Sequence, residues 1–309
     1  FRAIDATTTT KTRISYAYDI RIFFQFLLDQ NPMFKDKNMS DFTVDVLDQI
    51  KAVDLEEYEE FLKVYKSADS SKTETNGERG VKRKISALRS FYAYYYKHEM
   101  ITTNPSVLID VPKIHDKNII RLDTDEVAML LDYIEHCGDT LTGQKRMYHE
   151  KTKDRDLAIV TLLLGTGIRV SECVGLDVED VDFKNNGIKV TRKGGNEMVV
   201  YFGPEVEKAL KKYLEVRENI KPLAGHEHAL FYSTQRRRIG VQAIENLVKK
   251  YAREITTTKK ITPHKLRSTY GTALYQETGD IYLVADVLGH KDVNTTKKHY
   301  AALDDARRR

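Results

Sequence analysis

Several residue types and motifs that mark common protein classes are scarce or absent in this chain of 309 residues. The two cysteines, Cys137 and Cys173, cannot build a disulfide framework and suit a reducing cytosol. His226 and His228 form the one close histidine pair and have no obvious partners, so no metal site is expected. No glycine-rich phosphate loop or dinucleotide motif occurs, so no nucleotide cofactor is indicated. No apolar run is long enough to span a bilayer, so no membrane partner is expected.

The composition that remains is that of a soluble globular protein with a small positive charge. Hydrophobic residues make up 41% and charged residues 31% of the chain, which is long enough for two cores. The formal net charge of +4 does not by itself indicate a nucleic-acid-binding protein. Basic clusters nevertheless recur at 82–84, 236–238, 249–250, 259–260 and 297–298. Each cluster alone is typical of a solvated face, but several on separate elements favour a polyanionic partner.

The first hundred residues have the periodicity of helices, predicted at 12–28, 55–65 and 81–98. The polar stretch 67–80 has the composition of a loop. The third helix has an apolar stripe and an opposite side rich in basic and hydroxyl residues. That side is either a solvated face or a surface that meets the phosphates of DNA. The candidate DNA-contacting residues on it are Lys82, Arg83, Ser86, Arg89 and Ser90, and Arg236 and Arg237 join them from the later basic cluster.

A change in composition predicts two domains. Residues 102–118 combine prolines with charge, which is typical of a linker. We place the first domain at 1–112, the linker at 113–119 and the second domain at 120–309.

The second domain is predicted to be mainly helical with one small sheet. Helices are expected at 124–136 and 155–165, with a loop or insertion at 137–151 between them. From 177 to 203, alternating apolar residues and two glycine-bearing turns predict a three-stranded antiparallel meander. Helices resume at Pro204. The fold class is therefore mainly α with a small antiparallel sheet.

Polar residues occur where this local structure would display them. Arg169 follows the glycines of "GTG" between two helices, and a structural ion pair with Glu172 would explain it equally well. Lys193 lies in the turn "TRKGGN" between the second and third strands, a common place for a surface lysine.

The last third of the chain adds four more candidate residues. His264 and Arg267 lie near the start of a predicted helix in "ITPHKLRSTYGTALYQ", capped by Thr262 and Pro263. We expect both on the side away from the apolar residues Leu266, Tyr270, Ala273 and Leu274, where they form either a structural pair or a phosphate-binding pair.

His290 follows a glycine that should end a helix at 281–288, and Tyr300 comes ten residues later. A helix-turn-helix that reads DNA would also account for this segment.

The order of these residues along the chain is arginine, lysine, a histidine and arginine three positions apart, histidine and tyrosine. In this order they resemble the catalytic domain of tyrosine site-specific recombinases, the family of Xer recombinases and phage or transposon integrases. The similar stretches are "LLLGTGIRVSECVGLDVEDVDF", "VTRKGGN", "ITPHKLRSTYGTALYQ" and "VLGHKDVNTTKKHY". The resemblance covers roughly residues 120–302 and is Xer-like, with a conjugative-element or phage integrase as the alternative. It implies a two-domain clamp, in which 1–112 is a helical core-binding (SAM-like) DNA-binding domain and 120–309 the α+β catalytic domain.

The resemblance also implies the role of each residue. Tyr300 would attack the scissile phosphate and form a 3′-phosphotyrosyl bond. Arg169 and Arg267 would hold the non-bridging oxygens, oriented in part by Glu172, and His290 would donate to the same charge. Lys193 would protonate the leaving 5′-oxygen, and His264 would assist proton removal or hold the phosphate. No cofactor or metal is implied. One departure is Ser268, where many members of the family have histidine.

The partners implied are a double-stranded DNA recombination site and three further copies of the chain, as a homotetramer on two sites. An accessory protein is a further partner that the resemblance allows, and the location implied is the bacterial cytoplasm, at the nucleoid. The process would be chromosome dimer resolution or mobile-element integration and excision. Two alternatives remain open: a type IB topoisomerase, which uses a similar phosphate clamp, and a DNA-binding regulator that does not cleave.

Overall fold

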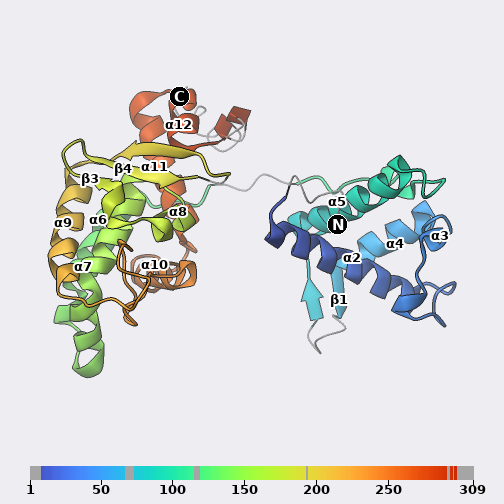
Figure 1. The fold of residues 1–309 in the computed structure, drawn as a ribbon, viewed down its shortest axis with the longest axis horizontal. Helices are drawn as coiled ribbons and strands as arrows, with labels where there is room; N and C mark the ends of the chain where they lie inside the picture. The colour runs from blue at the N-terminus through green and yellow to red at the C-terminus, as the bar shows by residue number, and fades with distance from the viewer. Residues whose placement is uncertain are drawn as a thin grey trace. The chain divides into compact units, whose positions relative to one another are not determined.

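The structure, a computed structural model, describes residues 8–66, 73–114, 119–192, 194–290, 293–294 and 296–297. The chain divides into two compact units, Phe1–Lys117 and Asn118–Arg309, each with its own hydrophobic core (Figure 1). Helices dominate both units, and each unit has one antiparallel sheet, of two and three strands respectively, among the described residues. The predicted mainly helical fold class with small sheets is confirmed. No helix in the described ranges combines the length and apolar content needed to cross a membrane.

The first unit is a helical body packed around aromatic side chains. Its core includes Phe23 on α2, Tyr58 on α4 and Tyr92 on α5, each fully buried, and the Phe23 and Tyr58 rings meet edge to face at 5.0 Å. Its elements are α2 (Thr10–Gln30), η1 (Met39–Asp41), α3 (Val44–Leu47), α4 (Ala52–Lys63), β1 (Val64–Lys66), β2 (Thr73–Thr75), α5 (Glu78–Lys97) and η2 (Pro105–Val107).

Two expectations for this unit were wrong. Part of the expected loop at 67–80 is structured, because Thr73–Thr75 pairs with Val64–Lys66 as an antiparallel hairpin and α5 begins at Glu78. Threonine and valine favour extended structure, which outweighs the polar composition. The beginning of the expected linker at 102–118 is packed in the core, where Ile109 is 2% exposed. Composition alone did not separate a proline-containing packed segment from a linker.

The second unit is built around the long helix α7. This helix contacts α6, α9 and α11, and the core continues onto the inner face of the sheet β3–β4–β5. Its elements are α6 (Thr124–His136), η3 (Cys137–Asp139), α7 (Gly143–Thr166), α8 (Val170–Gly175), η4 (Val178–Asp180), β3 (Val181–Asp182), β4 (Gly187–Thr191), β5 (Glu197–Tyr201), α9 (Pro204–Glu218), α10 (Val241–Ile255), α11 (Pro263–Thr278) and α12 (Ile281–Leu288).

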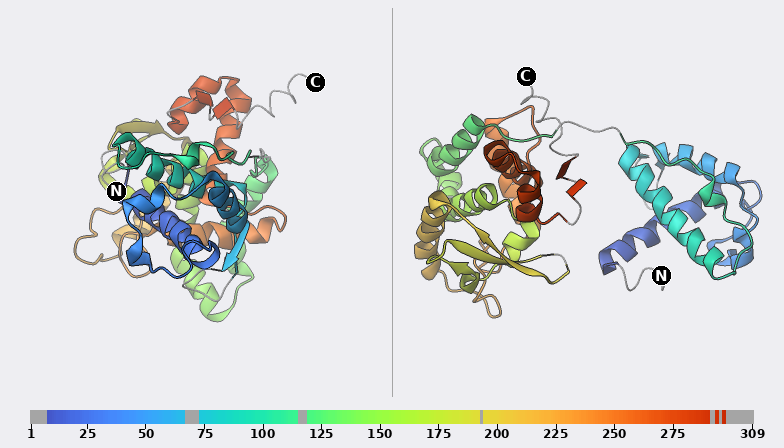
Figure 2. Two further views of the ribbon diagram at one scale, coloured as in Figure 1. Left: turned by 90° about the vertical axis from the view of Figure 1, so that its right-hand side faces the viewer. Right: turned by 90° about the horizontal axis from the view of Figure 1, so that it is seen from above.

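The predicted three-stranded meander is present, in the order β3–β4–β5, with Ile188 opposite Val200 in the β4–β5 register. Figures 1 and 2 both show the β4–β5 hairpin as an extended ribbon along one side of the unit. The expected loop at 137–151 was wrong, because α7 already begins at Gly143. Its first three turns have no continuous apolar stripe, yet they contain Gln, Lys, Arg, Met and Glu, which have high helix propensity.

Of the two helices that carry the site, α11 begins and α12 ends at a predicted signal. Helix α11 starts with Thr262 as N-cap and Pro263 at the first turn, as expected. Helix α12 spans the predicted residues and ends at Gly289, which is left-handed with φ of +63°. The expected apolar side of α11 was only partly right: Leu266 is buried, but Ala273 is exposed and Arg267 is buried. The helix contacts α7, α10 and α12, so it is covered on more than one side.

Candidate active site

The C-terminal end of α12 is the point where residues from distant parts of the second unit meet. A helix leaves its last carbonyl groups without partners inside the helix, and they carry the negative end of its dipole. Here arginine side chains donate to four consecutive carbonyls, those of residues 286–289. Arg192, at the end of β4, donates from Nη1 to Asp286 O at 3.3 Å and from Nη2 to Val287 O at 2.7 Å.

Arg267 on α11 is the most deeply placed of these arginines, with 5% of its surface exposed. Its two terminal nitrogens donate to the carbonyl of Gly167, at the end of α7, and to the carbonyl of Leu288. Gly167 itself is left-handed with φ of +62° and closes α7. The guanidinium thus joins the ends of α7 and α12, and its plane is fixed by both contacts.

Arg169 reaches the same helix end from the start of α8. Its Nη1 donates to Glu172 Oε1 at 2.7 Å, and its Nη2 donates to Gly289 O at 3.2 Å. Its backbone N–H donates to the other carboxylate oxygen of Glu172 at 2.8 Å, so the carboxylate caps the start of α8. The Glu172 side chain is 4% exposed and the Arg169 side chain 36% exposed, so a buried carboxylate orients a guanidinium that solvent can reach.

His290 follows directly after the glycine that ends α12. Its backbone N–H donates to Ala285 O at 2.9 Å, and its Nδ1 lies 2.7 Å from Thr296 Oγ1. The half-buried imidazole therefore has a defined position beside the carbonyls that Arg169 and Arg267 contact. The structure brings together four of the predicted residues: Arg169, Glu172, Arg267 and His290.

His264 lies one helical turn before Arg267 on α11 and is exposed. Ser268, at the position of the family departure, is 8% exposed and donates from Oγ to the His264 carbonyl at 3.1 Å. Lys193 and Tyr300 lie outside the described residues. Their predicted roles therefore rest on the sequence alone. For Lys193, the sequence places it directly after Arg192.

The charges around the end of α12 favour an anionic ligand. Three guanidinium groups share this region with the carboxylates of Glu172 and Asp286, so positive charge exceeds negative charge among these groups. Burial lowers the pKa of Arg192 and nearby Arg169 lowers it further, whereas the carboxylates of Glu172 and Asp286 oppose both effects. An arginine remains charged despite such a shift. A phosphate group is the kind of ligand that such a cluster of planar donors holds.

Arg192 is the residue of this cluster that the sequence did not reveal. In the sequence it looks like an ordinary cation at the start of a β-turn, and no periodic signal links it to α12. One sign was present: a charged residue directly before the candidate Lys193. No group of three or more metal-binding side chains occurs within the described part of the chain.

The candidate DNA-contacting residues on α5 are partly engaged within the first unit. Arg83 pairs with the buried Asp19, and Arg89 donates from Nε to Ser106 O at 3.0 Å and from Nη2 to Ile109 O. The hydroxyls of Ser86 and Ser90 donate to α5 carbonyls one turn earlier. These contacts were not expected from the helix periodicity.

Lys82, on the same side of α5, is half-buried. The predicted basic face of this helix therefore contains two arginines that are paired within the unit and a lysine for which the structure gives no such internal pairing.

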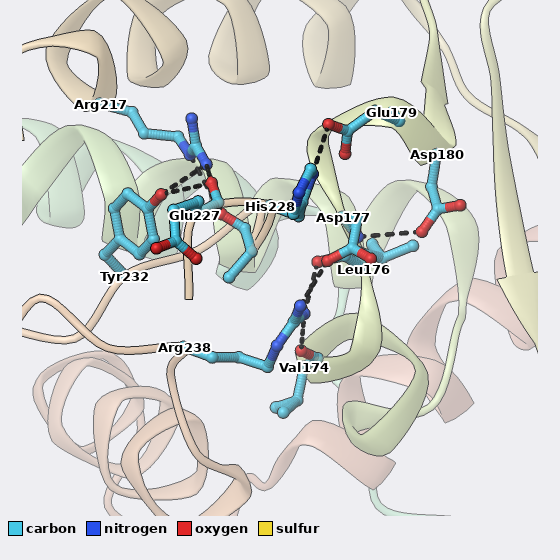
Figure 3. Close-up of polar contacts among 11 residues, drawn as sticks. Val174, Leu176, Asp177, Glu179, Asp180, Arg217, Glu227, His228, Tyr232 and Arg238 are labelled. Carbon is cyan, nitrogen blue, oxygen red and sulfur yellow. Dashed lines mark hydrogen bonds and ion pairs between the residues drawn. The ribbon is translucent and has the colours of Figure 1, made fainter. Parts of the chain in front are cut away.

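Arg236 and Arg237 lie in the turn between the bridged residues Tyr232 and Arg238, and both are exposed. The third arginine of this cluster, Arg238, is structural: it donates to Val174 O and Leu176 O at 3.0 and 2.8 Å and pairs with Asp177 (Figure 3). A single basic cluster thus contains one arginine that anchors the segment and two that face solvent.

The fold and the cluster at α12 can now be compared with known proteins. Residues 121–307 match the phage integrase family. This chain belongs to that family. It is a tyrosine site-specific recombinase, an enzyme class whose activity does not depend on a metal.

Two relatives extend the similarity over most of the recombinase. It is 32% identical over 306 residues to tyrosine recombinase XerC of Caldanaerobacter subterraneus subsp. tengcongensis, which covers 96% of this chain and 78% of the relative. It is 30% identical over 314 residues to tyrosine recombinase XerS of Streptococcus uberis, which covers 95% of this chain and 87% of the relative.

Solved structures show that the fold is shared at lower identity. A XerH site-specific recombinase bound to a palindromic difH substrate matches with a TM-score of 0.69 and 20% identity, over 94% of this chain and 78% of that chain. A lambda integrase dimer bound to a COC′ core site matches with a TM-score of 0.65 and 17% identity, over 96% of this chain and 90% of that chain.

Proposed function

We propose that this recombinase cleaves and rejoins duplex DNA at a recombination site through a 3′-phosphotyrosyl bond to Tyr300. The biological process is chromosome dimer resolution or the integration and excision of a mobile element. The observation that carries the proposal is the meeting of Arg169, Arg267 and His290 at the end of α12. Such a cluster supplies from the protein alone the positive charge that phosphoryl transfer requires.

Arg169 and Arg267 hold the two non-bridging oxygens of the scissile phosphate. Each guanidinium is fixed by main-chain carbonyls before DNA arrives, so little reorganisation accompanies binding. Glu172 orients Arg169 through the 2.7 Å ion pair. His290 adds a donor to the same oxygens, where negative charge increases in the transition state.

Tyr300 supplies the nucleophile. Its phenolic oxygen forms a bond to phosphorus, the bond from phosphorus to the 5′-oxygen breaks, and the phenolic proton is transferred away. His264 on the exposed side of α11 assists that transfer or contacts the phosphate. Lys193 donates a proton to the leaving 5′-oxygen. The same steps in reverse, with a 5′-hydroxyl from another strand, rejoin the DNA.

Both units contact the duplex in this proposal. Lys82, Arg83, Ser86, Arg89 and Ser90 do so from the first unit as a core-binding domain, and Arg236 and Arg237 do so from the second. A homotetramer on two sites carries out the exchange, with an accessory protein as a further partner, in the bacterial cytoplasm. The support for DNA as the partner is that the XerH and lambda integrase structures contain DNA.

The deciding experiment traps the covalent intermediate. Recombinase is incubated with sheared genomic DNA, the fragments that become attached to protein are sequenced, and a nicked suicide substrate is built from the site so found. Wild type and Tyr300→Phe are then compared by denaturing gel in the presence of EDTA. We expect an adduct with wild type only. Tight binding of both proteins without an adduct would contradict the proposal and favour a regulator that does not cleave.

The role of Lys193 has a separate test. A substrate with sulfur in place of the bridging 5′-oxygen has a leaving group that does not need protonation. Lys193→Ala should cleave ordinary DNA at least 100-fold more slowly, as expected for loss of a general acid, and cleave the sulfur substrate at close to the wild-type rate. Equal loss on both substrates would contradict this role.

A further inference from the structure

Arg192 connects two parts of the catalytic unit that are far apart in the sequence. It follows the last residue of β4, and its side chain donates to the carbonyls of Asp286 and Val287 in the last turn of α12. Two donors on two successive carbonyls fix both the position and the orientation of a planar guanidinium. The end of β4 is therefore held at a defined place beside the helix that precedes His290.

Packing at Gly289 confirms how closely Arg192 approaches. A Cβ atom at Gly289 would overlap Nη1 and Cζ of Arg192. A side chain at this position would therefore displace the guanidinium, and the left-handed φ of +63° independently favours glycine. The guanidinium covers the main chain at the exact residue whose carbonyl Arg169 contacts.

The described residues of the turn that follows Arg192 have few contacts outside the hairpin. Arg192 N donates to Asn196 O at 2.7 Å and Gly195 N donates to Arg192 O at 3.0 Å, both within the hairpin. Gly194 and Gly195 both have positive φ, and apart from its chain neighbours nothing lies within 4 Å of a Cβ added at either glycine. Of the turn residues that the structure describes, Arg192 is the one whose side chain hydrogen-bonds to another element.

We propose that Arg192 is a positioning residue that ties the β4–β5 turn to the C-terminal end of α12 and thereby sets the place of the next residue, Lys193, for protonation of the leaving 5′-oxygen. The inference rests on the proposed general-acid role of Lys193. Without the two carbonyl contacts, the turn samples positions from which an ammonium does not reach the 5′-oxygen. Misplacement of a catalytic group by about 1 Å can lower a rate about 100-fold.

The experiment compares cleavage of ordinary DNA and of the 5′-sulfur substrate by full-length Arg192→Ala, Arg192→Lys and Lys193→Ala. We expect Arg192→Ala to lose about 100-fold on ordinary DNA and to cleave the sulfur substrate within about threefold of wild type, because a misplaced acid does not matter when no proton is needed. Arg192→Lys retains the charge but lacks the planar pair of nitrogens that contact the two carbonyls separately, so it should show the same selective loss to a smaller extent.

Lys189→Ala is the matched control. Lys189 lies on the same strand, and its half-exposed side chain is near Asp180 and Glu197 rather than α12. This variant should cleave both substrates at the wild-type rate. Thermal unfolding and DNA binding of each variant establish that the proteins compared are folded, and Arg192→Lys serves if Arg192→Ala does not fold.

The outcomes separate the inference from the function on which it rests. If the sulfur substrate rescues Lys193→Ala but neither Arg192 variant, Arg192 acts on the site in another way and the positioning role is wrong. Unchanged cleavage of ordinary DNA by the Arg192 variants also overturns it. If Lys193→Ala is not rescued, the general-acid role fails and the inference fails with it. If the sulfur substrate restores cleavage by both Lys193→Ala and the Arg192 variants, the general-acid role and the positioning role are both supported.

Discussion

Arg169 and Arg267 should lose cleavage alike when they are replaced by alanine, but they should differ in what they contribute to stability. In the proposed mechanism both hold the same phosphate, and loss of one such donor typically costs 100-fold or more in rate. Arg267 is also a buried connection between the ends of α7 and α12, whereas Arg169 is 36% exposed. The structure therefore predicts one variant defective mainly in catalysis and one defective in catalysis and folding.

The size of the difference follows from the contacts. Arg267→Ala removes a charged donor from two carbonyls, and a hydrogen bond to a charged group contributes about 1.5–3 kcal/mol. Because water can partly replace the lost donors to these carbonyls, we expect a loss of about 4 kcal/mol in the free energy of unfolding. Arg169→Ala removes a guanidinium that solvent reaches, while the backbone N–H and the nearby Arg192 still compensate the buried Glu172 carboxylate, so we expect about 1 kcal/mol.

The assay is thermal unfolding of the full chain, followed beside adduct formation on the suicide substrate. In a unit of this size, 1 kcal/mol corresponds to about 2–4 °C, so the midpoint should fall by roughly 10 °C for Arg267→Ala and roughly 3 °C for Arg169→Ala. Lys265→Ala removes one cation from the same helix as a control and should leave the midpoint unchanged. Equal shifts for the two arginine variants, or a larger one for Arg169→Ala, would refute the reasoning.

Three further predictions concern single residues. Gly289→Ala should lower cleavage at least tenfold and also lower the unfolding midpoint, because its Cβ overlaps the guanidinium above it; Gly279→Ala, with the same left-handed backbone, should lose stability but retain cleavage. The hydrogen bond from Glu179 raises the pKa of His228, so Glu179→Gln should lower that pKa. The pair stabilises the fold below the ordinary histidine pKa, and this contribution is lost as pH rises through the raised pKa of His228. An unchanged NMR titration of the His228 ring would contradict the prediction. Burial raises the pKa of Cys173 to about 12, so this thiol should react with iodoacetamide at pH 8 only after unfolding, and rapid alkylation of the native protein would contradict its burial.

Local signals in the sequence predicted the helices that have clear ends. Helices α12 and α6 were predicted with their observed bounds. The glycine was the signal for the end of α12, and the structure adds that the Asp280 side chain caps the start of α12 and that the Glu126 side chain caps the start of α6. The first turns of α7 could not be predicted in this way, because they are polar on all sides and depend on the apolar turns that follow. The segment up to Ile109 was taken for linker because its burial depends on long-range contacts.

The site was predictable as a set of residues but not as an arrangement. The order of Arg169, Arg267 and His290 along the chain indicated a phosphate-binding site, and the structure brings these three together. That the guanidinium groups of Arg169 and Arg267 are held by main-chain carbonyls could not be inferred, because carbonyl positions depend on how α7, α11 and α12 pack. Arg192 was missed for the same reason: its partners are backbone atoms of a helix that follows much later in the chain.

The use of carbonyl groups at the end of α12 has a consequence for how this region can change during evolution. A carbonyl is present whatever side chain a residue carries, so Asp286, Val287 and Leu288 can be exchanged without removing the acceptors of Arg192 and Arg267. Only the helical conformation and the glycine after it must persist. Because the acceptors are backbone atoms, the arginines and the residues that they contact need not change together in an alignment. The connection can therefore survive extensive divergence of the residues that provide it.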